Sequence, residues 1–334
     1  MLHTLEALQA RVEAALTAHG ATPLQAGSTA RALVMAQASD MPSHGLSRVP
    51  MYVSHLRHHR VVGDAVPRVI ASKPAAVLID AANGFAFPAC VLAIEEAIAR
   101  ARQNGIAIAA ITNSHHFGMA AYHLDPVAEA GMVGIACGNS PAAMPAAGGK
   151  HALFGTNPIA AVFPRPGQLP VSLDLSLSEV ARGKLMVAAE KGQSIPLGWA
   201  LDAQGEPTTD PKQGLAGSML PMGGAKGAVL ALMVELLVTT LTGAHFGAEA
   251  SSFFVAEGNQ PRLGQAFIVI DPGALAGSAV YAQRVQALLD AMLVDEGVRI
   301  PGQRRYRGVQ AAQAQGLEVP DATLQAIDAL IRPA

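Results

Sequence analysis

The sequence predicts an α/β protein in which helices cover a large mixed sheet and an all-helical region comes first. Three observations support this fold class. Residues 4–60 show helical patterning alone, and after Pro67 short apolar runs that suit strands alternate with helical segments. The composition, 51% hydrophobic and 14% charged, is sufficient to fill large cores. At 334 residues the chain is long enough for a large α/β domain and a smaller one.

The helical region is predicted to contain three helices. An amphipathic helix runs from the start of the chain to about Ala18. Thr22 and Pro23 suit the N-cap and the first position of a second helix, and a third begins near Ser47. Pro50 fits only in the first turn of that third helix.

The alternating segments after Pro67 follow in order. The strand-like runs lie at residues 75–80, 106–112, 132–140, 158–164, 171–176 and 266–271. The helical runs lie at residues 89–105, 119–131 and 227–243, in a helix through Val285, Leu288 and Met292, and in a last helix with Leu324, Ile327 and Ile331. This order is typical of a sheet covered by helices.

The segment at residues 227–243 resembles a membrane span in its apolar character. It is short, however, with Glu235 at its centre and Lys226 just before it, whereas a spanning helix needs about 20 apolar residues with few charges. A buried core helix is the better prediction, and no membrane partner is expected.

Charge and cysteine content limit the function classes. The formal net charge is −2 and the pI is near 6.6, which gives no attraction to nucleic acid or anionic lipid. The two cysteines, Cys90 and Cys137, each lie in an apolar run, so we expect buried thiols and no disulfide framework. No basic start followed by an apolar signal stretch is present, and cytoplasm is the expected location.

Two polar clusters interrupt the apolar pattern. "SHGLSRVPMY" places Ser43, His44 and Arg48 together, and the pair Ser43 and His44 is expected immediately before a helix N-terminus, which favours negative charge. "TNSHHFGMA" places His115 and His116 at the end of a predicted strand, where open α/β sheets bind ligands. A histidine is more often structural than catalytic. No metal site is expected, because neither H-E-x-x-H nor paired cysteines occur.

Two further segments could bind an anion. In "PMGGAKGAVLALMVELL", Lys226 lies at a helix start among glycines, which suits a phosphate or carboxylate as well as a solvated turn. "RRYRG" holds Arg304, Arg305 and Arg307, usually a solvated run but also a match for phosphate geometry. The fingerprints G-x-G-x-x-G and G-x-x-x-x-G-K-[ST] are both missing among 33 glycines. If the chain binds a nucleotide, it does so in another way.

The motifs "SHGLSRVP", "TNSHHFG", "FGTNPIA", "DLSLSEVARGKL", "IPLGWALDAQGEPTTDP", "LPMGGAKGAVLALMVELL" and "IPGQRR" resemble, in order over nearly the whole chain, the type II malate/L-lactate dehydrogenase family. The resemblance implies a non-Rossmann NAD(P)-binding fold. "GGAKGAVLALMVELL", "ASSFF" and "GNQPRLGQAFIVIDPGAL" are most similar to the Δ1-piperideine-2-carboxylate and Δ1-pyrroline-2-carboxylate reductases of that family. Those enzymes reduce the C=N bond of a cyclic imino acid with NADPH, giving L-pipecolate or L-proline.

The resemblance implies three sets of site residues. The catalytic set is Ser43, His44 and Lys184, and the substrate-binding set is Arg48, Thr156, Arg182 and Gly183. The cofactor-binding set is His116, Phe117, Gly118, Met119, Ala120, Asp174, Leu175, Ser176, Ala225, Lys226 and the loop of Arg304, Arg305, Tyr306, Arg307, Gly308, Val309 and Gln310. Lys184 departs from the imino-acid reductases, which carry an aspartate as the third relay member, and agrees with the hydroxy-acid dehydrogenases.

The resemblance also implies the organisation of the chain. An N-terminal helical region at residues 1–62 contributes Ser43, His44 and Arg48 to the site, and residues 63–300 form an α/β NADP-binding and catalytic domain. A basic loop and a helix at residues 301–334 pack back on the N-terminal region. Family members are similar in forming homodimers with the site near the interface, so a homodimer is expected.

These residues predict a mechanism. Hydride delivered to an imine or keto carbon requires a proton at nitrogen or oxygen, and His44, near its unperturbed pKa of about 6.5, is the predicted donor. Ser43 would orient the imidazole and Arg48 would hold the substrate carboxylate at two points. NADPH is expected to be preferred to NADH through Arg304 and Arg305, with Arg307 toward solvent.

The alternatives left open are a 2-hydroxy-acid dehydrogenase of the malate, lactate, sulfolactate or ureidoglycolate type and, more distantly, a non-catalytic binding protein. The sequence does not decide between five- and six-membered imino acids, which differ by one methylene. Catabolism of hydroxyproline and of D-lysine are both open contexts.

Overall fold

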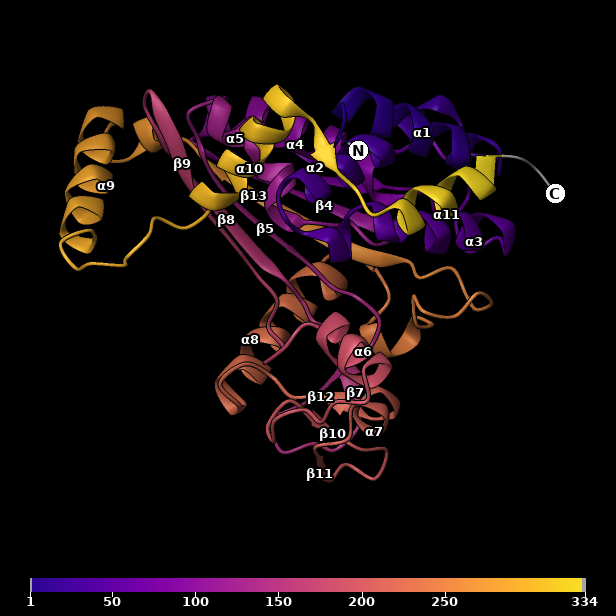
Figure 1. Ribbon diagram of the computed structural model, residues 1–334. Helices are drawn as coiled ribbons and strands as arrows, with labels where there is room; N and C mark the ends of the chain where they lie inside the picture. Colours follow the sequence, from indigo (N-terminus) through magenta and orange to yellow (C-terminus); the bar gives the residue numbers. More distant parts are fainter. Residues whose placement is uncertain (1, 332–334) are drawn as a thin grey trace.

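A seven-stranded mixed sheet forms the larger lobe of the protein, whose computed structural model describes residues 2–331 (Figure 1). Strands β3 and β4 pair in parallel and are joined by helix α4 (Ala86–Asn104), whereas the other neighbouring strands of this sheet are antiparallel. In order across the sheet, the strands are β2 (Arg68–Lys73), β3 (Ala76–Asp80), β4 (Ile106–Ser114), β13 (Leu263–Ile270), β5 (Val133–Gly138), β8 (Ile159–Arg165) and β9 (Gln168–Leu175). Each strand predicted from the sequence is therefore confirmed, with ends shifted by a few residues.

A layer of helices lies beside the sheet and has its own apolar core. Thr22 is the N-cap of the second helix and Pro23 its first residue, as predicted. A short pairing of β1 (Leu2–His3) with β14 (Leu317–Glu318) brings the two ends of the chain together. The helices of this layer are α1 (Leu5–Thr17), α2 (Pro23–Ala38), α3 (Val49–Arg57), α10 (Gln303–Gln315) and α11 (Asp321–Ile331).

The two faces of the sheet are covered by different helices because strand side chains alternate between them. On β13, Phe267 and Val269 pack into the core that contains α4, whereas Ala266 packs into the core that contains α8 (Ala225–Glu235). The short helices η3 (Ala120–Leu124) and α5 (Asp125–Glu129) replace the single helix predicted over residues 119–131. Helix α9 (Ser278–Met292) extends away from the sheet (Figure 1).

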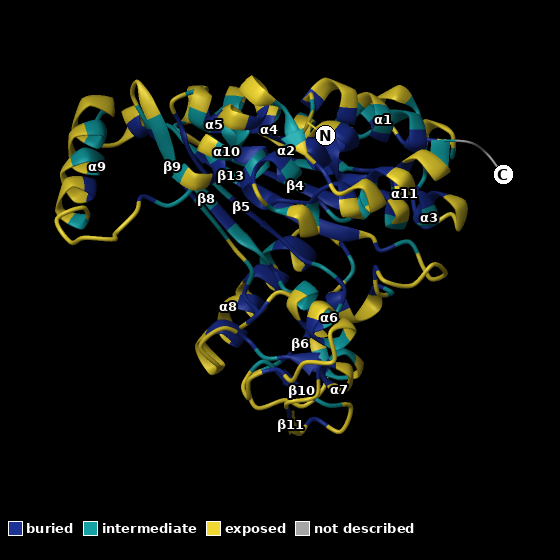
Figure 2. Cartoon of the chain, viewed as in Figure 1, coloured by how far each residue is buried: buried dark blue, intermediate teal, exposed yellow. Residues whose placement is uncertain are grey.

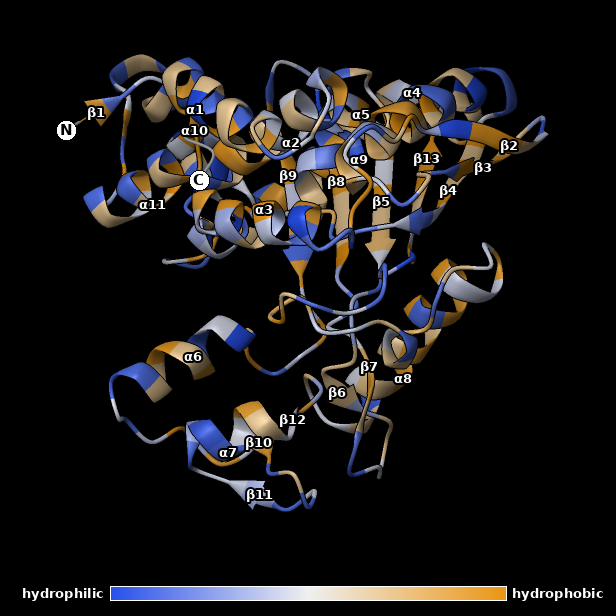
Figure 3. Cartoon of the chain, turned by 90° about the vertical axis from the view of Figure 1, so that its right-hand side faces the viewer, coloured by the Kyte–Doolittle hydropathy of each residue, from blue (hydrophilic) through white to orange (hydrophobic). Residues whose placement is uncertain are grey.

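A smaller lobe lies beyond the strand ends at one side of the sheet (Figure 3). The chain enters it after β5 and returns at β8, then enters it again after β9 and returns at β13. Its elements are β6 (Met144–Pro145), β7 (Ala152–Phe154), α6 (Arg182–Glu190), β10 (Ala200–Leu201), β11 (Pro207–Thr208), α7 (Pro211–Ala216), β12 (Ser218–Met219), α8, η4 (Leu236–Thr240) and η5 (Gly247–Glu249). The sequence did not predict this lobe, because strands of two or three residues carry no periodic signal.

The prediction of a buried core helix at residues 227–243 holds for one face, which includes Ala231, Val234 and Val238, and is wrong for the other. Helix α8 ends at Glu235 and continues as the π-helical turn η4, and Val229 and Leu241 are 61% and 64% exposed. Figure 2 shows exposed positions along this helix. The smaller lobe is too thin to cover both sides of α8, so one apolar face stays uncovered.

The loop predicted at residues 304–310 is also wrong. Gly302 adopts the left-handed conformation as an N-cap, and Gln303 begins helix α10, which includes the whole basic segment. Within residues 2–331 no helix combines the length and the apolar character that crossing a membrane requires.

Candidate active site

Ser43, His44 and Arg48 form one compact group at the end of α2. Ser43 Oγ lies 3.0 Å from His44 Nδ1, and Arg48 Nε donates a hydrogen bond of 2.5 Å to the carbonyl oxygen of Ser43. This bond uses one edge of the guanidinium to fix the turn. The predicted proximity of Ser43 and His44 to the N-terminus of a helix is wrong: they lie in the turn η1 (Pro42–His44), and a second turn, η2 (Leu46–Arg48), separates them from α3. The positive charge at this place therefore comes from Arg48.

His44 does not keep the ordinary pKa that the sequence suggested. Burial of the imidazole, together with the nearby Arg48 guanidinium, lowers the pKa of His44 to about 4. The free protein thus holds His44 neutral at pH 7. An anion bound to Arg48 would offset the repulsion that the guanidinium exerts on a protonated imidazole.

The second polar cluster meets the first one in space. His116 stacks on His44 with ring centroids 5.6 Å apart, and His116 Nδ1 lies 2.7 Å from the Tyr52 hydroxyl on α3. As predicted, this cluster follows the end of a strand, since β4 ends at Ser114. Strand β4 runs parallel to β3 and antiparallel to β13. Its end lies on the side of the sheet where the strand ends face the smaller lobe (Figure 3).

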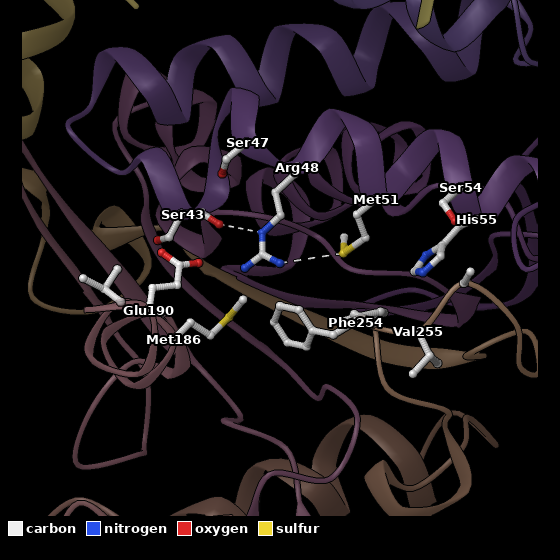
Figure 4. Close-up of a pocket in the computed structure, with 14 residues that line it drawn as sticks. Ser43, Ser47, Arg48, Met51, Ser54, His55, Met186, Glu190, Phe254 and Val255 are labelled. Carbon is white, nitrogen blue, oxygen red and sulfur yellow. Dashed lines mark hydrogen bonds between the residues drawn. The ribbon is translucent and has the colours of Figure 1, made fainter. Parts of the chain in front are cut away.

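A cavity of about 540 Å³ lies between the lobes beside this group (Figure 4). Ser43, Arg48 and His55 line it from the helical layer, Gly183 and Glu190 from α6, and Phe254 from the loop before β13. Arg48 and Glu190 are the charged side chains of its lining. Its wall is otherwise mostly apolar, which suits a small organic acid held at a few polar points.

The structure brings Gly183 into the lining of this cavity and Arg182 against its wall at Phe254, but neither Lys184 nor Thr156 lines it. Gly183 lines the cavity, and the Arg182 guanidinium lies 5.3 Å from the Phe254 ring while donating to the carbonyl of Leu215. The Lys184 ammonium lies 5.9 Å from the ring of Trp199, and no hydrogen bond or ion pair within residues 2–331 joins it to Ser43 or His44. The Thr156 backbone bonds to Ser140 Oγ and to the Leu177 N–H.

In the segment from His116 to Ala120, several side chains are buried, which leaves the backbone as the part that a cofactor could contact. Phe117 and Met119 are buried in the core, and Gly118 has a positive φ of 70°. The buried His123 side chain donates a 2.7 Å hydrogen bond from Nε2 to the Phe117 carbonyl, and this bond restrains the segment. Just beyond it, the Ala121 N–H donates to the Asp174 carboxylate at 2.9 Å. Two of the predicted cofactor segments are thus adjacent.

The side chains of the basic segment at residues 304–310 differ in burial. The Arg305 side chain is buried, donates to Ser172 Oγ, and lies 4.0 Å from the Asp174 carboxylate. Tyr306 donates a 2.6 Å hydrogen bond to Asp125, whose pKa burial raises to about 6. Gly308 and Val309 face the helical layer, and Gln310 is exposed.

A second cavity, of about 700 Å³, lies at the N-terminus of α10 and is lined by Arg299, Arg304 and Arg307. Arg304 also pairs with Asp40 at 3.3 Å in an exposed position. Three guanidinium groups beside a helix N-terminus form a donor set that fits a phosphate. Of the arginines predicted to bind the cofactor, Arg304 and Arg307 are thus available here, with Arg299 beside them, whereas Arg305, which the sequence favoured, is occupied internally.

The remaining predicted cofactor residues lie at the surface or near it. Leu175 is 38% exposed, and Ser176 Oγ lies 2.9 Å from Ser178 Oγ. Ala225 and Lys226 are exposed at the start of α8, after Gly223 and Gly224, both of which have positive φ. No ion pair within residues 2–331 includes Lys226.

Sequence reasoning missed several residues of the cavity and its support. Tyr52 and His55 follow Arg48 at helical spacing, a signal that could have placed them on the same face of α3. Arg60, Phe254 and Glu190 gave no such signal, because loop contacts between distant segments leave no local pattern.

The comparisons with known proteins agree with this arrangement. Residues 3–328 match the family described as malate/L-lactate dehydrogenase. The chain is 48% identical over 316 residues to the (2R)-3-sulfolactate dehydrogenase (NADP(+)) of Chromohalobacter salexigens, covering 95% of this chain and 94% of that one. It is 40% identical over 325 residues to a Δ1-pyrroline-2-carboxylate/Δ1-piperideine-2-carboxylate reductase of Pseudomonas putida, covering 97% and 95%.

The crystal structure of the Δ1-piperideine-2-carboxylate reductase of Pseudomonas syringae pv. tomato aligns with a TM-score of 0.93 at 37% identity, over 99% of both chains. The sulfolactate dehydrogenase of Methanocaldococcus jannaschii aligns with a TM-score of 0.89 at 31% identity, over 99% of this chain and 96% of that one.

The fold, the Ser–His–Arg site and these likenesses together define an oxidoreductase built on a sheet other than the Rossmann type. The chain belongs to the malate/L-lactate dehydrogenase family. The family resemblance and the fold class inferred from the sequence are both confirmed.

Proposed function

We propose that this protein reduces a cyclic imino acid, Δ1-pyrroline-2-carboxylate or Δ1-piperideine-2-carboxylate, to the corresponding L-amino acid with NADPH. The observation that carries the choice of substrate is the charge of the cavity lining, where Arg48 supplies a cation and Glu190 a carboxylate. A cyclic imino acid with a protonated nitrogen carries one negative and one positive charge, and it complements this pair. A doubly anionic acid would meet the Glu190 carboxylate with Arg48 as the one cation of the lining.

In the proposed reaction, Arg48 binds the substrate carboxylate through its terminal nitrogens, because its Nε already bonds to Ser43. NADPH, when bound, supplies the hydride that the C2 carbon accepts. His44 must first be protonated; it then keeps one proton at Nδ1, which faces Ser43 Oγ at 3.0 Å, and delivers the other from Nε2 to the ring nitrogen, which leaves the imidazole neutral. Hydride addition turns the C=N double bond of the protonated imine into a C–N single bond and gives a neutral amine, and the amine nitrogen then takes the proton that His44 gives up, so that the product is the zwitterionic amino acid.

The second candidate is a 2-hydroxy-acid dehydrogenase acting on a doubly anionic substrate such as sulfolactate. Arg182 favours it, because its guanidinium also lies against Phe254 and could bind a second anionic group. The 48% identity to the sulfolactate dehydrogenase of Chromohalobacter salexigens and the lysine at position 184 support the same candidate.

A substrate panel separates the candidates. NADPH oxidation would be measured with pyrroline-2-carboxylate, piperideine-2-carboxylate, pyruvate, oxaloacetate and sulfopyruvate. We expect the highest kcat/KM with one of the two imino acids. A higher value with sulfopyruvate or oxaloacetate would establish the second candidate instead, and no oxidation with any substrate would favour a binding protein.

The lowered pKa of His44 predicts a pH dependence. For reduction, kcat/KM should fall about tenfold per unit between about pH 6 and pH 8, because the free protein must first take up a proton at a group whose pKa is about 4. Oxidation of the product needs neutral His44, which is the form present from pH 6 to pH 8. Titration of His44 should therefore not change the kcat/KM for oxidation in that range.

The imine nitrogen also titrates, whereas a 2-oxo acid has no such group. Reduction rates measured with a 2-oxo acid at high protein concentration therefore serve as the control. A His44→Asn variant should lose the slope. A reduction profile that is level from about pH 6 to pH 8 in the parent protein would contradict a proton donor with so low a pKa.

Coenzyme preference is expected to depend on the second cavity. We expect NADPH to be preferred to NADH by at least about tenfold in kcat/KM, because guanidinium groups can bind the 2′-phosphate that NADH lacks. The double change Arg304→Ala and Arg307→Ala should remove most of this preference, and added salt should narrow it in the parent protein.

Two controls belong to this measurement. Arg284→Ala removes an exposed arginine of α9 and should leave the ratio unchanged. Arg305→Ala removes the buried guanidinium and should affect both coenzymes alike, because its contacts are to Ser172 and Asp174. A parent ratio that survives the double change would rule out Arg304 and Arg307 as the phosphate site.

The exposed apolar face of α8 and η4 supports the proposal of a homodimer. Its exposed apolar residues are Val229, Leu230, Leu232, Met233, Leu236 and Leu241. An apolar face of this kind is typical of an interface with another protein surface. We expect sedimentation at micromolar concentration to give about twice the chain mass of 34.3 kDa.

The change Val229→Asp with Leu236→Asp should shift the protein toward the monomer while its circular dichroism stays the same. Val294→Asp, an exposed apolar residue after α9, is the matched control and should not dissociate the dimer. A monomer of 34.3 kDa in the parent protein would end the proposal.

A further inference from the structure

Arg60 is a buried cation that has no carboxylate partner. Its side chain is 0% exposed, and none of the ion pairs within residues 2–331 includes it. Its guanidinium instead donates to four backbone carbonyl oxygens of one loop. These are the carbonyls of Ser251 at 2.9 Å, Ser252 at 3.0 Å, Val255 at 2.6 Å and Asn259 at 3.2 Å.

The loop at residues 251–259 is closed by these bonds and by one pair of its own. The Ser251 N–H donates to Asn259 Oδ1 at 2.9 Å, and the Asn259 N–H donates to Ser251 Oγ at 3.2 Å. A planar guanidinium with five N–H donors can reach four carbonyls in one plane, which an ammonium group cannot do. The end of α3 and this loop, nearly 200 residues apart in the sequence, are thus fastened by one side chain.

The fastened loop forms one wall of the candidate active site. Phe253, Phe254 and Val255 line the cavity (Figure 4). The Phe254 ring centroid lies 5.4 Å from the Arg48 guanidinium carbon and 5.3 Å from that of Arg182. At this distance an aromatic ring attracts a guanidinium and restricts its orientation. The position of the loop therefore affects both arginines that could bind an anionic substrate group.

Arg60 also fixes a pair of histidines under the cavity. Its Nη1 also lies 3.0 Å from His55 Nε2, so the two Nη1 hydrogens are shared among this nitrogen and the carbonyls of Ser252 and Val255; because arginine can only donate, His55 Nε2 is the acceptor. The His55 Nδ1–H then donates to His115 Nε2 at 2.9 Å. Burial and the positive charge of Arg60 lower the pKa of both histidines, which stay neutral in this arrangement. His55 reaches the cavity wall with one defined tautomer.

We propose that Arg60 is a positioning residue for substrate recognition: by fastening the loop at residues 251–259 to the end of α3, it holds Phe254 against Arg48 and Arg182. The proposal rests on the proposed function only in that the cavity takes the anionic substrate. Arg60 itself contacts the loop and His55 and does not line the cavity.

The test compares Arg60→Lys and Arg60→Met with the parent holoenzyme. We expect the KM for the acid substrate to rise about tenfold in Arg60→Lys and further in Arg60→Met, while the KM for NADPH changes less than about twofold. The kcat should fall less than the substrate KM rises, because the proton donor His44 is not in contact with this loop. Amide hydrogen exchange at residues 249–260 should become faster, and it is measured without substrate.

Two loop variants keep the test decisive if changes at the buried Arg60 prevent folding. Asn259→Ala removes the closing pair of the exposed loop, and Phe254→Leu removes the ring, so each should raise the substrate KM without changing the KM for NADPH. Arg100→Met is the matched control, because Arg100 also donates to two backbone carbonyls, those of Lys73 and Pro74, at a place that does not line the cavity. It should leave the substrate KM unchanged.

An unchanged substrate KM in folded Arg60→Lys, or in both loop variants, would overturn the proposal. So would an equal loss of kcat and of both affinities, which indicates a structural role alone. If the parent protein reduces a 2-oxo acid instead of an imino acid, the proposed function fails. The role of Arg60 is still decided in that case, by the KM for the 2-oxo acid and by the amide hydrogen exchange of residues 249–260.

Discussion

Replacing His44 with alanine is expected to lower kcat by about 10² to 10⁴, the usual effect of removing a positioned general acid. Ser43 Oγ and the stacked His116 hold the imidazole, and neither side chain is placed to give a proton in its stead. His116 is buried, and burial with the nearby cations lowers its pKa well below the ordinary value. The affinity for NADPH should remain nearly unchanged, because His44 is not among the predicted cofactor residues. Stopped-flow measurement of hydride transfer would report the chemical step directly.

Ser43→Ala separates orientation of the imidazole from proton transfer. It removes the partner of His44 Nδ1 and leaves the imidazole in place, so a smaller loss of kcat is expected than in His44→Ala. Near-normal turnover in a folded His44→Ala protein would remove His44 from the mechanism, whatever the Ser43 variant does.

Replacing Arg48 with lysine is expected to raise the KM for the acid substrate by about 10- to 100-fold. The guanidinium does two things at once, since its Nε bonds to the Ser43 carbonyl and its terminal nitrogens, of which Nη1 makes only a weak 3.7 Å hydrogen bond to Met51 Sδ, can bind the substrate. A lysine ammonium keeps the charge but cannot occupy both places, and it loses the flat contact with Phe254. A charge-assisted hydrogen bond is worth about 1.5–3 kcal/mol, which corresponds to this range of KM.

Arg57→Lys offers a matched control on the same helix. Arg57 lies at the end of α3, where it is exposed and contacts His19 rather than the cavity. Its replacement should change the substrate KM less than about twofold. An unaltered KM in Arg48→Lys would show that Arg48 is structural and that the substrate carboxylate binds elsewhere, with Arg182 the first candidate.

The parts of the fold that the sequence predicted are those with a strong local period. The strands over Ile106–Ser114 and Leu263–Ile270, and the helix that starts at Pro23, were all found from apolar patterning and N-terminal signals. The smaller lobe escaped prediction because its strands have only two or three residues, too few to show a period. Residues 227–243 misled because a helix that is apolar on all sides is ordinarily buried, whereas α8 has an uncovered face.

The candidate site likewise has features that the sequence predicted and features that only the fold reveals. The proximity of Ser43, His44 and Arg48 follows from their spacing, and family resemblance supplied the positions of the remaining candidates. The lowered pKa of His44 and the engagement of Arg305 with Ser172 depend on burial, which no local pattern reveals. Arg60 lies in a run of histidines and arginines, "RHHR", that would ordinarily be solvated. Only the fold shows that this run ends inside the protein.

The place of β13 in the sheet affects how the chain can fold as it is made. This strand is the last of the seven in sequence, yet it lies between β4 and β5 in the middle of the sheet. Until residue 270 leaves the ribosome, the strands β2, β3 and β4 cannot be joined to β5, β8 and β9, so any partial sheet formed by either set would leave β4 or β5 unpaired at an apolar edge. Such edges pair readily with other chains. The nascent protein is therefore most prone to aggregate, and most in need of a chaperone, while the segment between β9 and β13 is being synthesised.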